Sequence, residues 1–597
     1  MKKLKNSPKA KIKDLSQKMF RAMEKGHHDE VIALGEELIA AYGEKNAPAE
    51  LYYNIGEAYV NKITSDENFW QKPRQEQINI KKAAFKCWEK AFVAGLLKTP
   101  EEIIYYVIFG SETFMHLHLK MYRVIKDTFA KIRQGIYAKP SPGIMALYYE
   151  NFVTCAVALG FHAEAFEAAR ESWLAAKDTQ KRAERYGGLL LIAQYLDFSA
   201  ADLFELHKVY DSFFKDIEPH KYDLAALTAE LKQTGRRIRV GYISPDCRRH
   251  VAAKFFAGLL RFADREKFAV YMYSTTDKPD AVTDKIKDSV EFFVPVPRIS
   301  HEELSARIMS DGIDILVELA GHTDGNALPV LAWKSAPVQI CGIGYLATTG
   351  LSTVDYYITD SIVDPPGQHE QYFTEKPLFL SSQFSAYATL EGDIPDIADA
   401  PFLKNGFVTF GVFNQYRKIT DEMIAAWGQI LARSDNSRLL LKCSEYANEE
   451  FVTDAKARFA AFGLPAERLI FEKATRDYMA RYLDVDIALD TYPYTGGGTT
   501  LDALYMGVPL VTLYGERRNT RFSLGILANV GLKYLAADSV AKYVELAVQL
   551  AADRNLLNAL HRKIRPMLTN SVPGRPDLYT KELEQQYLQI LGLGENP

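Results

Sequence analysis

The sequence has few cysteines and places them far apart, which excludes two kinds of site. Only five of its 597 residues are cysteine, and none forms a Cys-x-x-Cys pair or clusters with histidine. This spacing fits neither a structural zinc site nor a disulfide framework. It is typical of a protein from a reducing compartment, with free buried thiols at Cys87, Cys155, Cys247, Cys341 and Cys443.

The chain also lacks a long apolar run and an excess of charge of one sign. No uninterrupted apolar segment approaches the roughly 20 residues of a transmembrane helix, and no apolar leader follows the lysines near the start. The formal net charge of -4 at pH 7 gives no general attraction for nucleic acid or for an anionic membrane. We therefore expect a cytoplasmic protein with no membrane span and no nucleic-acid partner.

Strand patterns are almost absent from the first third of the chain. Apolar and small residues recur there at helical spacing in paired runs, for example over 31–41 and 51–59. A later pair, separated by Leu159 and Gly160, resembles a tetratricopeptide unit. Stacked helix pairs of this type leave a concave surface suited to a protein segment. We predict an all-α, tetratricopeptide-like domain over residues 1–230, with a plain helical domain that binds nothing as the alternative.

From residue 236 onward, short apolar strands alternate with amphipathic helices, which predicts parallel α/β sheets. Two doubly wound domains in succession usually hold a ligand in the cleft between them. We predict one lobe over 236–385, a second over 400–568 and a C-terminal helix over 569–597. The expected strands are 238–244, 268–273, 314–319, 338–345 and 356–358 in the first lobe, and 407–413, 438–443, 469–471, 485–489 and 510–513 in the second.

One strand–turn–helix segment carries the clearest signal for chemistry. Its strand pattern ends at Leu489, an aromatic turn follows, and the next helix runs from about Leu501. Glycines let backbone N–H groups approach a ligand closely, and a helix N-terminus offers unpaired donors and a favourable dipole to an anion. The segment predicts a phosphate or pyrophosphate cradle, with an ordinary strand-to-helix turn as the alternative. The cradle residues are Gly496, Gly497, Gly498, Thr499 and Thr500, with Asp502 placed to accept hydrogen bonds from ribose hydroxyls.

Further motifs follow one another in order along the chain. They are 239–246 with His250, 311–323, 336–339, 354–360, 405–414 with Gln415 and Lys418, 489–491, 496–500 and 505–509. In these motifs the chain resembles the protein O-GlcNAc transferases and the SPINDLY-type protein O-fucosyltransferases. The resemblance covers about residues 236–590, whereas the helical repeats match in type only. It implies a GT-B glycosyltransferase preceded by tetratricopeptide repeats.

The chemistry that the resemblance implies is direct attack by a Ser or Thr hydroxyl on C1 of a nucleotide sugar, with inversion. The enzyme must then position both substrates, ease the acceptor proton away and neutralise the leaving pyrophosphate. His250 matches the family's active-site histidine, as a base or as an electrostatic guide; a loop histidine bonded to backbone is the alternative. Lys418 matches the lysine that contacts the pyrophosphate, where a point charge replaces a metal ion; a solvated lysine is the alternative.

Other contacts are assigned by the same resemblance. Gln415 is expected to help hold the donor, and Tyr478 and Arg481 fall where the family packs the nucleotide base. His322 and Tyr345 are candidates for contact with the sugar or the acceptor, although a structural role for His322 is equally supported. The acceptor protein would be held partly by the helical repeats.

The donor sugar stays open. Animal O-GlcNAc enzymes carry a histidine at the position of Gly497, while the segments 492–494 and 505–509 are closer to the SPINDLY type. UDP-GlcNAc is the favoured donor, GDP-fucose is the alternative, and a non-catalytic tetratricopeptide scaffold is a third possibility. We expect no cofactor and no metal ion, because the DxD pattern of Asp484 and Asp486 lies at the start of a strand, away from the cleft edge.

Overall fold

The chain folds into two compact units, Met1–Leu159 and Gly160–Pro597. The computed structural model describes residues 8–66, 69, 72, 74–114, 117–386 and 388–594. The first seven residues of the predicted helical domain and the last three of the chain lie outside these ranges. Within the described ranges, no helix is both long enough and apolar enough to cross a membrane.

The first unit is all-helical, as predicted, and each helix packs against its neighbour in sequence. Small residues allow close packing: Gly35 lies against the Ile55 side chain, and Gly56 lies against the Trp88 ring. Thr99 caps one helix through a reciprocal pair of hydrogen bonds with Glu102, which satisfies amides that the first turn leaves unpaired. The helices are α1 (Pro8–Glu24), α2 (His28–Tyr42), α3 (Ala49–Ser65), α4 (Arg74–Val93), α5 (Pro100–Thr113), α6 (His118–Arg133) and α7 (Pro142–Ala158).

The second unit begins with helices that pack on the α/β lobes. His207 Nε2 lies 2.8 Å from the Tyr345 hydroxyl, and the Ser352 amide donates to Asp211 Oδ1 at 3.0 Å. The division at residue 159 therefore falls inside the region for which a single helical domain was predicted. These helices are α8 (His162–Ala175), α9 (Thr179–Ala193), α10 (Ala200–Lys208) and α11 (Leu224–Thr234).

The first lobe contains a parallel sheet in the order β3-β2-β1-β4-β5-β6-β7. Val240 of β1 pairs with Val270 on one side and with Ile315 on the other, so the order reverses between β1 and β4. Both strands are almost wholly buried, as expected for parallel strands covered by helices on both faces. The strands are β1 (Ile238–Ser244), β2 (Phe268–Ser274), β3 (Phe292–Pro295), β4 (Ile315–Glu318), β5 (Val338–Cys341), β6 (Tyr356–Asp360) and β7 (Lys376–Leu380), with helices α12 (Val251–Arg261), α13 (Ala281–Asp288) and α14 (His301–Ser310).

The second lobe repeats this plan with the order β10-β9-β8-β11-β12-β13. Phe410 of β8 pairs with Leu439 and with Ile487, so here the order reverses between β8 and β11. The predicted fold class is confirmed in both lobes. The strands are β8 (Val408–Val412), β9 (Ser437–Cys443), β10 (Leu469–Lys473), β11 (Ile487–Leu489), β12 (Leu510–Leu513) and β13 (Ala536–Ala537), with helices α15 (Phe402–Asn405), α16 (Asp421–Arg433), α17 (Glu449–Ala461), α18 (Tyr478–Arg481), α19 (Gly498–Tyr505), α20 (Phe522–Asn529), α21 (Val540–Ala552) and α22 (Arg554–Thr569).

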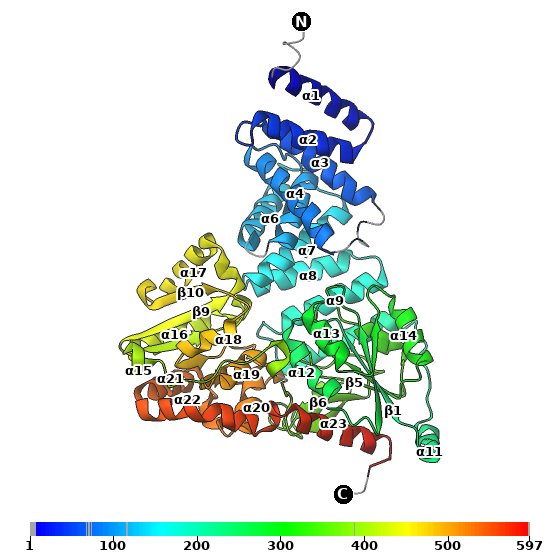
Figure 1. Cartoon of the computed structure of the whole chain (residues 1–597), viewed down its shortest axis with the longest axis vertical. Helices are drawn as coiled ribbons and strands as arrows, with labels where there is room; N and C mark the ends of the chain where they lie inside the picture. The colour runs from blue at the N-terminus through cyan, green and yellow to red at the C-terminus, as the bar shows by residue number, and fades with distance from the viewer. Residues whose placement is uncertain are drawn as a thin grey trace. The chain divides into compact units, whose positions relative to one another are not determined.

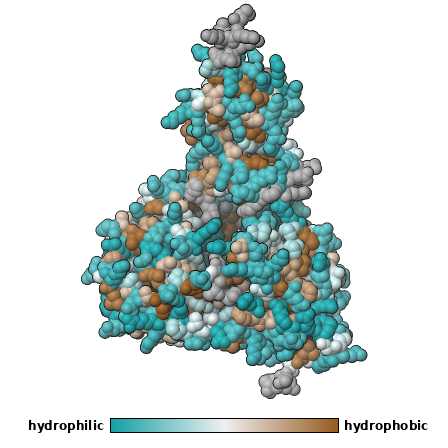
Figure 2. Space-filling model, in the orientation of Figure 1, coloured by the Kyte–Doolittle hydropathy of each residue, from teal (hydrophilic) through white to brown (hydrophobic). Residues whose placement is uncertain are grey.

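The last helix, α23 (Pro576–Ile590), returns from the second lobe and packs against the first, as the red helix beside the green strands of Figure 1. Gly258 of α12 has no room for a side chain there, because a Cβ would lie 2.5 Å from Pro576 Cβ. The Tyr587 and Tyr242 hydroxyls are 3.3 Å apart. On the face shown in Figure 2, hydrophilic residues cover most of both lobes and apolar residues lie in small groups.

Candidate functional site

The glycine loop of the second lobe is organised by the buried carboxylate of Asp490, which follows β11. Its Oδ1 accepts hydrogen bonds from the amides of Thr491 and Gly496, both at 2.9 Å. Its Oδ2 accepts from the Thr512 and Ser523 hydroxyls at 2.8 and 2.5 Å. Burial raises the pKa of Asp490, while these hydrogen bonds oppose the increase. One side chain thus ties the loop to β12 and α20.

The loop lies where the strand order of the second lobe reverses. Asn414 follows β8 and Asp490 follows β11, and the Asn414 amide nitrogen lies 3.4 Å from Asp490 Oδ1. The Asn414 oxygen accepts from the Thr499 hydroxyl at 3.1 Å, and the Thr500 hydroxyl lies 2.8 Å from that of Ser523. Ligands of doubly wound domains bind at such a reversal, beyond the carboxyl ends of the strands.

The helix that leaves this loop has its amino end turned toward the reversal point. Gly497 is the N-cap residue of α19, and no side chain caps the helix. The amides of its first turn have no partner within the helix, which is the arrangement that binds anions. The predicted cradle residues Gly496, Gly497, Gly498, Thr499 and Thr500 form the end of the loop and the first turn of α19.

Lys418 lies beside the loop. Its Nζ donates to the Thr495 carbonyl at 3.2 Å and lies 3.6 Å from the centre of the Tyr494 ring. Burial lowers the pKa of the Lys418 ammonium to about 7; the Asp490 carboxylate opposes this effect and Arg417 adds to it. A lysine in this state gains a strong partner if a pyrophosphate enters the cradle.

Helix α12 of the first lobe covers the loop from the other side. A Cβ on Gly498 would lie 2.2 Å from Val251 Cγ2, so only glycine fits there without movement, whereas Gly497 has ordinary clearance from Phe255 and Phe384. His250 directly precedes Val251 and is the N-cap residue of α12. The two lobes therefore meet at the cradle.

His250 has two alternative partners for one ring nitrogen. Its Nδ1 accepts from the Ala252 amide at 3.3 Å and lies 3.2 Å from Asp246 Oδ2. An unprotonated Nδ1 caps the helix, whereas a protonated one pairs with the carboxylate. The side chain is 38% exposed, so the ring is accessible from solvent.

Asp502 and Tyr478 contact each other, and both contact a residue that the sequence analysis missed. The Tyr478 hydroxyl donates to Asp502 Oδ2 at 2.6 Å. Lys254 of α12 donates to Asp502 Oδ1 at 3.1 Å and to the Tyr478 hydroxyl at 2.9 Å. A lysine on the buried face of an otherwise apolar helix was the available signal.

Two other residues that were predicted to bind the nucleotide sugar have hydrogen-bond partners within the protein. Gln415 is exposed, and its Oε1 accepts from Arg417 Nε at 2.6 Å. Arg481 binds Glu472 through two nitrogens, at 2.9 and 2.7 Å, and also pairs with Asp484. Among the described residues, no group of three or more His, Cys, Asp or Glu could hold a metal ion.

The side chains of His322 and Tyr345 are enclosed by protein instead of lining the cradle. They are 2% and 1% exposed, and the Tyr210 ring lies 4.4 Å from the His322 ring. His322 Nε2 lies 2.7 Å from the Thr349 carbonyl, and burial lowers the pKa of His322 to about 3. In this structure neither side chain is accessible to a sugar or an acceptor, because the helices before the first lobe cover them.

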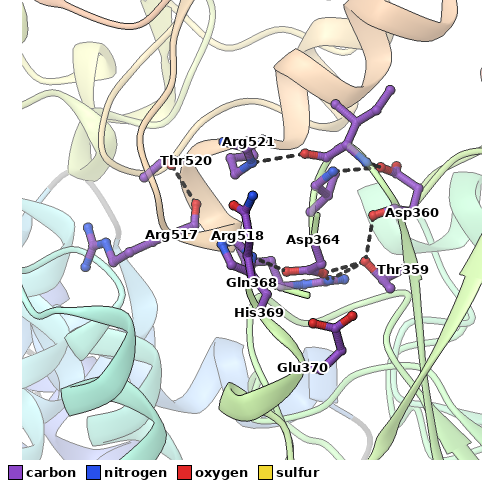
Figure 3. Close-up of polar contacts among 12 residues, drawn as sticks. Thr359, Asp360, Asp364, Gln368, His369, Glu370, Arg517, Arg518, Thr520 and Arg521 are labelled. Carbon is purple, nitrogen blue, oxygen red and sulfur yellow. Dashed lines mark hydrogen bonds and ion pairs between the residues drawn. The ribbon is translucent and has the colours of Figure 1, made fainter. Parts of the chain in front are cut away.

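A buried ion pair joins the lobes beyond the cradle. Arg518 of the second lobe pairs with Asp364 of the first, and donates to Thr359 Oγ1 and Gln383 Oε1, both at 2.7 Å. Figure 3 shows Arg518 turned toward Asp364 and Thr359, whereas Arg517 points away from them. Arg517 donates instead to the Leu196 carbonyl just after α9, at 2.6 Å.

A small cavity lies beside this junction and is lined by Leu203, Leu346, Phe373, Arg518 and Asn519; its volume is about 40 Å³. Arg518 Nε and Asn519 Oδ1 have no protein partner among the described residues. A cavity of this size has room for one or two water molecules, which would satisfy these two atoms.

Comparison with known proteins gives a family match over both lobes. The model described as "Glycosyl transferase family 41" matches residues 217–388 and 400–583. The chain is 36% identical over 408 residues to an Arabidopsis thaliana protein named "Probable UDP-N-acetylglucosamine--peptide N-acetylglucosaminyltransferase SPINDLY", covering 67% of this chain and 44% of that protein. A Petunia hybrida protein of the same name is 34% identical over 406 residues, with 67% and 43% covered. The chain thus spans less than half the length of these plant relatives.

One solved structure is similar over most of the chain. It is a lysine-to-methionine mutant of the Thermobaculum terrenum O-GlcNAc transferase, 25% identical, with a TM-score of 0.76. The similarity covers 90% of this chain and 98% of that one. It therefore extends beyond the residues that the family model matches.

Proposed function

Because the chain belongs to glycosyl transferase family 41, we propose that it moves a sugar from a nucleoside diphosphate sugar to Ser or Thr hydroxyls of a protein. The proposed transfer inverts the anomeric centre and needs no metal ion. One observation carries this proposal: at the strand reversal of the second lobe, the uncapped amino end of α19 follows the glycine loop and the Lys418 ammonium lies beside the same loop.

In the proposed complex, the diphosphate occupies the cradle of Gly496–Thr500. Amides of the first turn of α19 donate to its oxygens, and Lys418 exchanges its weak contact with the Thr495 carbonyl for a charged partner. This arrangement favours departure of the nucleoside diphosphate, because the developing negative charge meets donors that are already in place. Gln415, Tyr478, Arg481 and Asp502 are proposed to contact the nucleoside.

His250 is proposed to act on the acceptor hydroxyl from the first lobe. Its position directly before Val251, which contacts Gly498, supports a place next to the sugar end of the donor. The nearby Asp246 carboxylate would stabilise the ring after it takes up a proton. The burial of His322 and Tyr345 supports a structural role for both.

UDP-GlcNAc is the donor that we propose, because the names of the plant and bacterial relatives specify that sugar. GDP-fucose is the second candidate, since Gly497 stands where animal O-GlcNAc enzymes carry a histidine. Thermal unfolding with UDP or GDP separates the two, since a nucleotide at 100 times its Kd stabilises the folded state by about 2.7 kcal/mol. Stabilisation by GDP without stabilisation by UDP would overturn the choice of UDP-GlcNAc.

Transfer itself is tested by labelling of peptides or of a cell extract with the donor that binds. We expect labelling by the wild-type chain and none by Lys418→Met. A chain that binds neither nucleotide and labels nothing would instead support a non-catalytic scaffold. The acceptor is proposed to be a protein segment held partly by the helical repeats of the first unit.

A further inference from the structure

Lys254 is a buried cation that spans the two lobes at the proposed nucleoside site. It lies on α12 of the first lobe, whereas its partners Asp502 and Tyr478 lie on α19 and α18 of the second. Lys254 and Asp502 are 6% and 8% exposed. Ion pairs removed from water to this extent cost desolvation energy and add little net stability to the fold.

The contacts around Asp502 use one acceptor position on each oxygen. Lys254 Nζ donates to Oδ1 at 3.1 Å, and the Tyr478 hydroxyl donates to Oδ2 at 2.6 Å. Lys254 also donates to the Tyr478 hydroxyl at 2.9 Å, which closes the three side chains into a ring of hydrogen bonds. A carboxylate has about four acceptor positions, so further positions remain for a ligand.

We propose that Lys254 is a positioning residue that holds the Asp502 carboxylate in the orientation that reads ribose hydroxyls. The inference rests on the proposed function, in which Asp502 contacts the ribose. A carboxylate clamped on both oxygens cannot rotate, so its remaining lone pairs have fixed directions and can discriminate a vicinal diol from a deoxy sugar. The contact also makes ribose recognition depend on the first lobe, because Lys254 is held by α12.

The alternative is that Lys254 releases Asp502 and binds a phosphate oxygen of the donor as a point charge. The two roles predict different behaviour toward nucleotides that lack ribose hydroxyls. A phosphate contact is the same for ribonucleotides and dideoxynucleotides, so its loss weakens both equally. A positioning role affects recognition of the ribose hydroxyls alone, so its loss reduces the difference in affinity between the ribonucleotide and the dideoxynucleotide.

The test is calorimetric binding of UDP and 2′,3′-dideoxy-UDP to the whole chain, or of the guanosine pair if GDP is the nucleotide bound. We expect the wild type to prefer the ribonucleotide by at least about tenfold, as for a hydrogen bond to a charged group. In Lys254→Met this preference should fall to about twofold, and Lys254→Arg should restore most of it. Tyr478→Phe removes the donor to Oδ2 and the hydroxyl that accepts from Lys254, but it keeps the contact of Lys254 with Oδ1, so it should cause a partial loss of the preference.

Lys334→Met is the matched control. Lys334 also pairs with an aspartate, Asp355, but at the amino ends of β5 and β6, which is the opposite edge of the sheet. This variant should keep the full ribonucleotide preference. An unchanged preference in Lys254→Met and Tyr478→Phe, or an equal loss for both nucleotides, would overturn the positioning role. A wild type without any preference would overturn it as well, whereas a wild type that binds no nucleoside diphosphate would contradict the proposed function itself.

Discussion

The backbone amide of Gly496 donates a hydrogen bond to the carboxylate of Asp490, at 2.9 Å, and closes the glycine loop on the strand that precedes it. Four donors of the loop, β12 and α20 converge within 2.9 Å on the two oxygens of this carboxylate. The conformation of the loop therefore depends on a group that is itself hidden from any ligand.

Asp490→Asn should both destabilise the fold and weaken nucleotide binding. The new amide nitrogen would face a donor in either orientation, and a lost hydrogen bond to a buried charged group costs about 1.5–3 kcal/mol. Urea unfolding gives the stability, and calorimetry with UDP or GDP gives the affinity. Asp538→Asn, at an exposed side chain, should change the free energy of unfolding by less than about 0.5 kcal/mol. Equal effects of the two substitutions would contradict the role of Asp490.

Gly498→Ala should disturb the packing between the two lobes, and Val251→Ala should restore it. The added Cβ would lie 2.2 Å from Val251 Cγ2, and overpacking of this type costs about 1–3 kcal/mol. In Gly498→Ala/Val251→Ala the next atom is Val251 Cβ at 3.6 Å, an ordinary contact. We expect thermal stability and nucleotide affinity to return in the double variant. If the double variant is as impaired as Gly498→Ala, the clash is not the cause.

Nucleotide binding should weaken as the pH rises above 7. Lys418 in the free protein has a pKa near 7, because burial disfavours its charged form. A bound diphosphate favours that form, so above the free pKa binding must take up a proton, whereas below it the ammonium is already present. Affinity should therefore fall about tenfold from pH 6 to pH 8. Calorimetry in buffers of different ionisation enthalpy measures the proton uptake.

Substitutions of Lys418 provide the controls for the pH dependence of nucleotide affinity. Arginine keeps its charge throughout this range, so Lys418→Arg should bind with little dependence on pH between 6 and 8. Lys418→Met should lose both affinity and pH dependence. Proton uptake that persists in Lys418→Met would assign the titration to another group.

Arg518→Met, which breaks the buried ion pair with Asp364, should destabilise the second unit more than the loss of an exposed ion pair does. It leaves the Thr359 hydroxyl and the His369 ring as the partners of the buried Asp364 carboxylate, and removal of one member of a buried ion pair costs about 3–5 kcal/mol. Arg518→Met/Asp364→Asn also removes the buried carboxylate charge and should recover part of the lost free energy of unfolding. Arg433→Met, which breaks an exposed pair with Glu545, is the control and should cost about 1 kcal/mol or less. Chemical unfolding monitored by fluorescence measures all three.

Chelation should leave transfer unaffected if Lys418 and the amides of α19 neutralise the leaving diphosphate. Activity after treatment with EDTA, and after readdition of Mg²⁺ or Mn²⁺, is the measurement. Asp484→Asn, which alters the DxD pattern, should also leave activity intact. Loss of transfer on chelation that a divalent ion restores would contradict a metal-free mechanism.

The sequence predicted strand positions best where a strand is buried on both faces of its sheet. Residues 238–244 and 510–513 were predicted as strands with the bounds of β1 and β12, because parallel central strands read as continuous apolar runs. The missed strands are β3, β7 and β13. β3 is partly exposed along its length, β7 contains a proline and begins with an exposed lysine, and β13 has two residues. None of them offers a run that periodicity can detect.

Contacts between the lobes could not be predicted from local pattern. Lys254 meets Asp502 only because two sheets far apart in sequence face each other. His322 follows a buried strand, as an active-site residue often does, yet helices α9 and α10 cover that end of the sheet. The strand–glycine–helix pattern predicted the glycine loop and the resemblance supplied the position of Lys418, whereas only the fold shows that Asp490 orders the loop.

The division of the chain at residue 159 has a consequence for how such proteins can be recombined. The side chains of Arg517 and Asn519 donate hydrogen bonds to the carbonyls of Leu196 and Gln194. The segment just after α9 is therefore fixed to the second lobe. A graft that exchanged everything before β1 would remove these anchors and uncover His322 and Tyr345. A splice made before Gly160 keeps these anchors, so that junction is where a different helical unit can be joined with the cover over His322 and Tyr345 still in place.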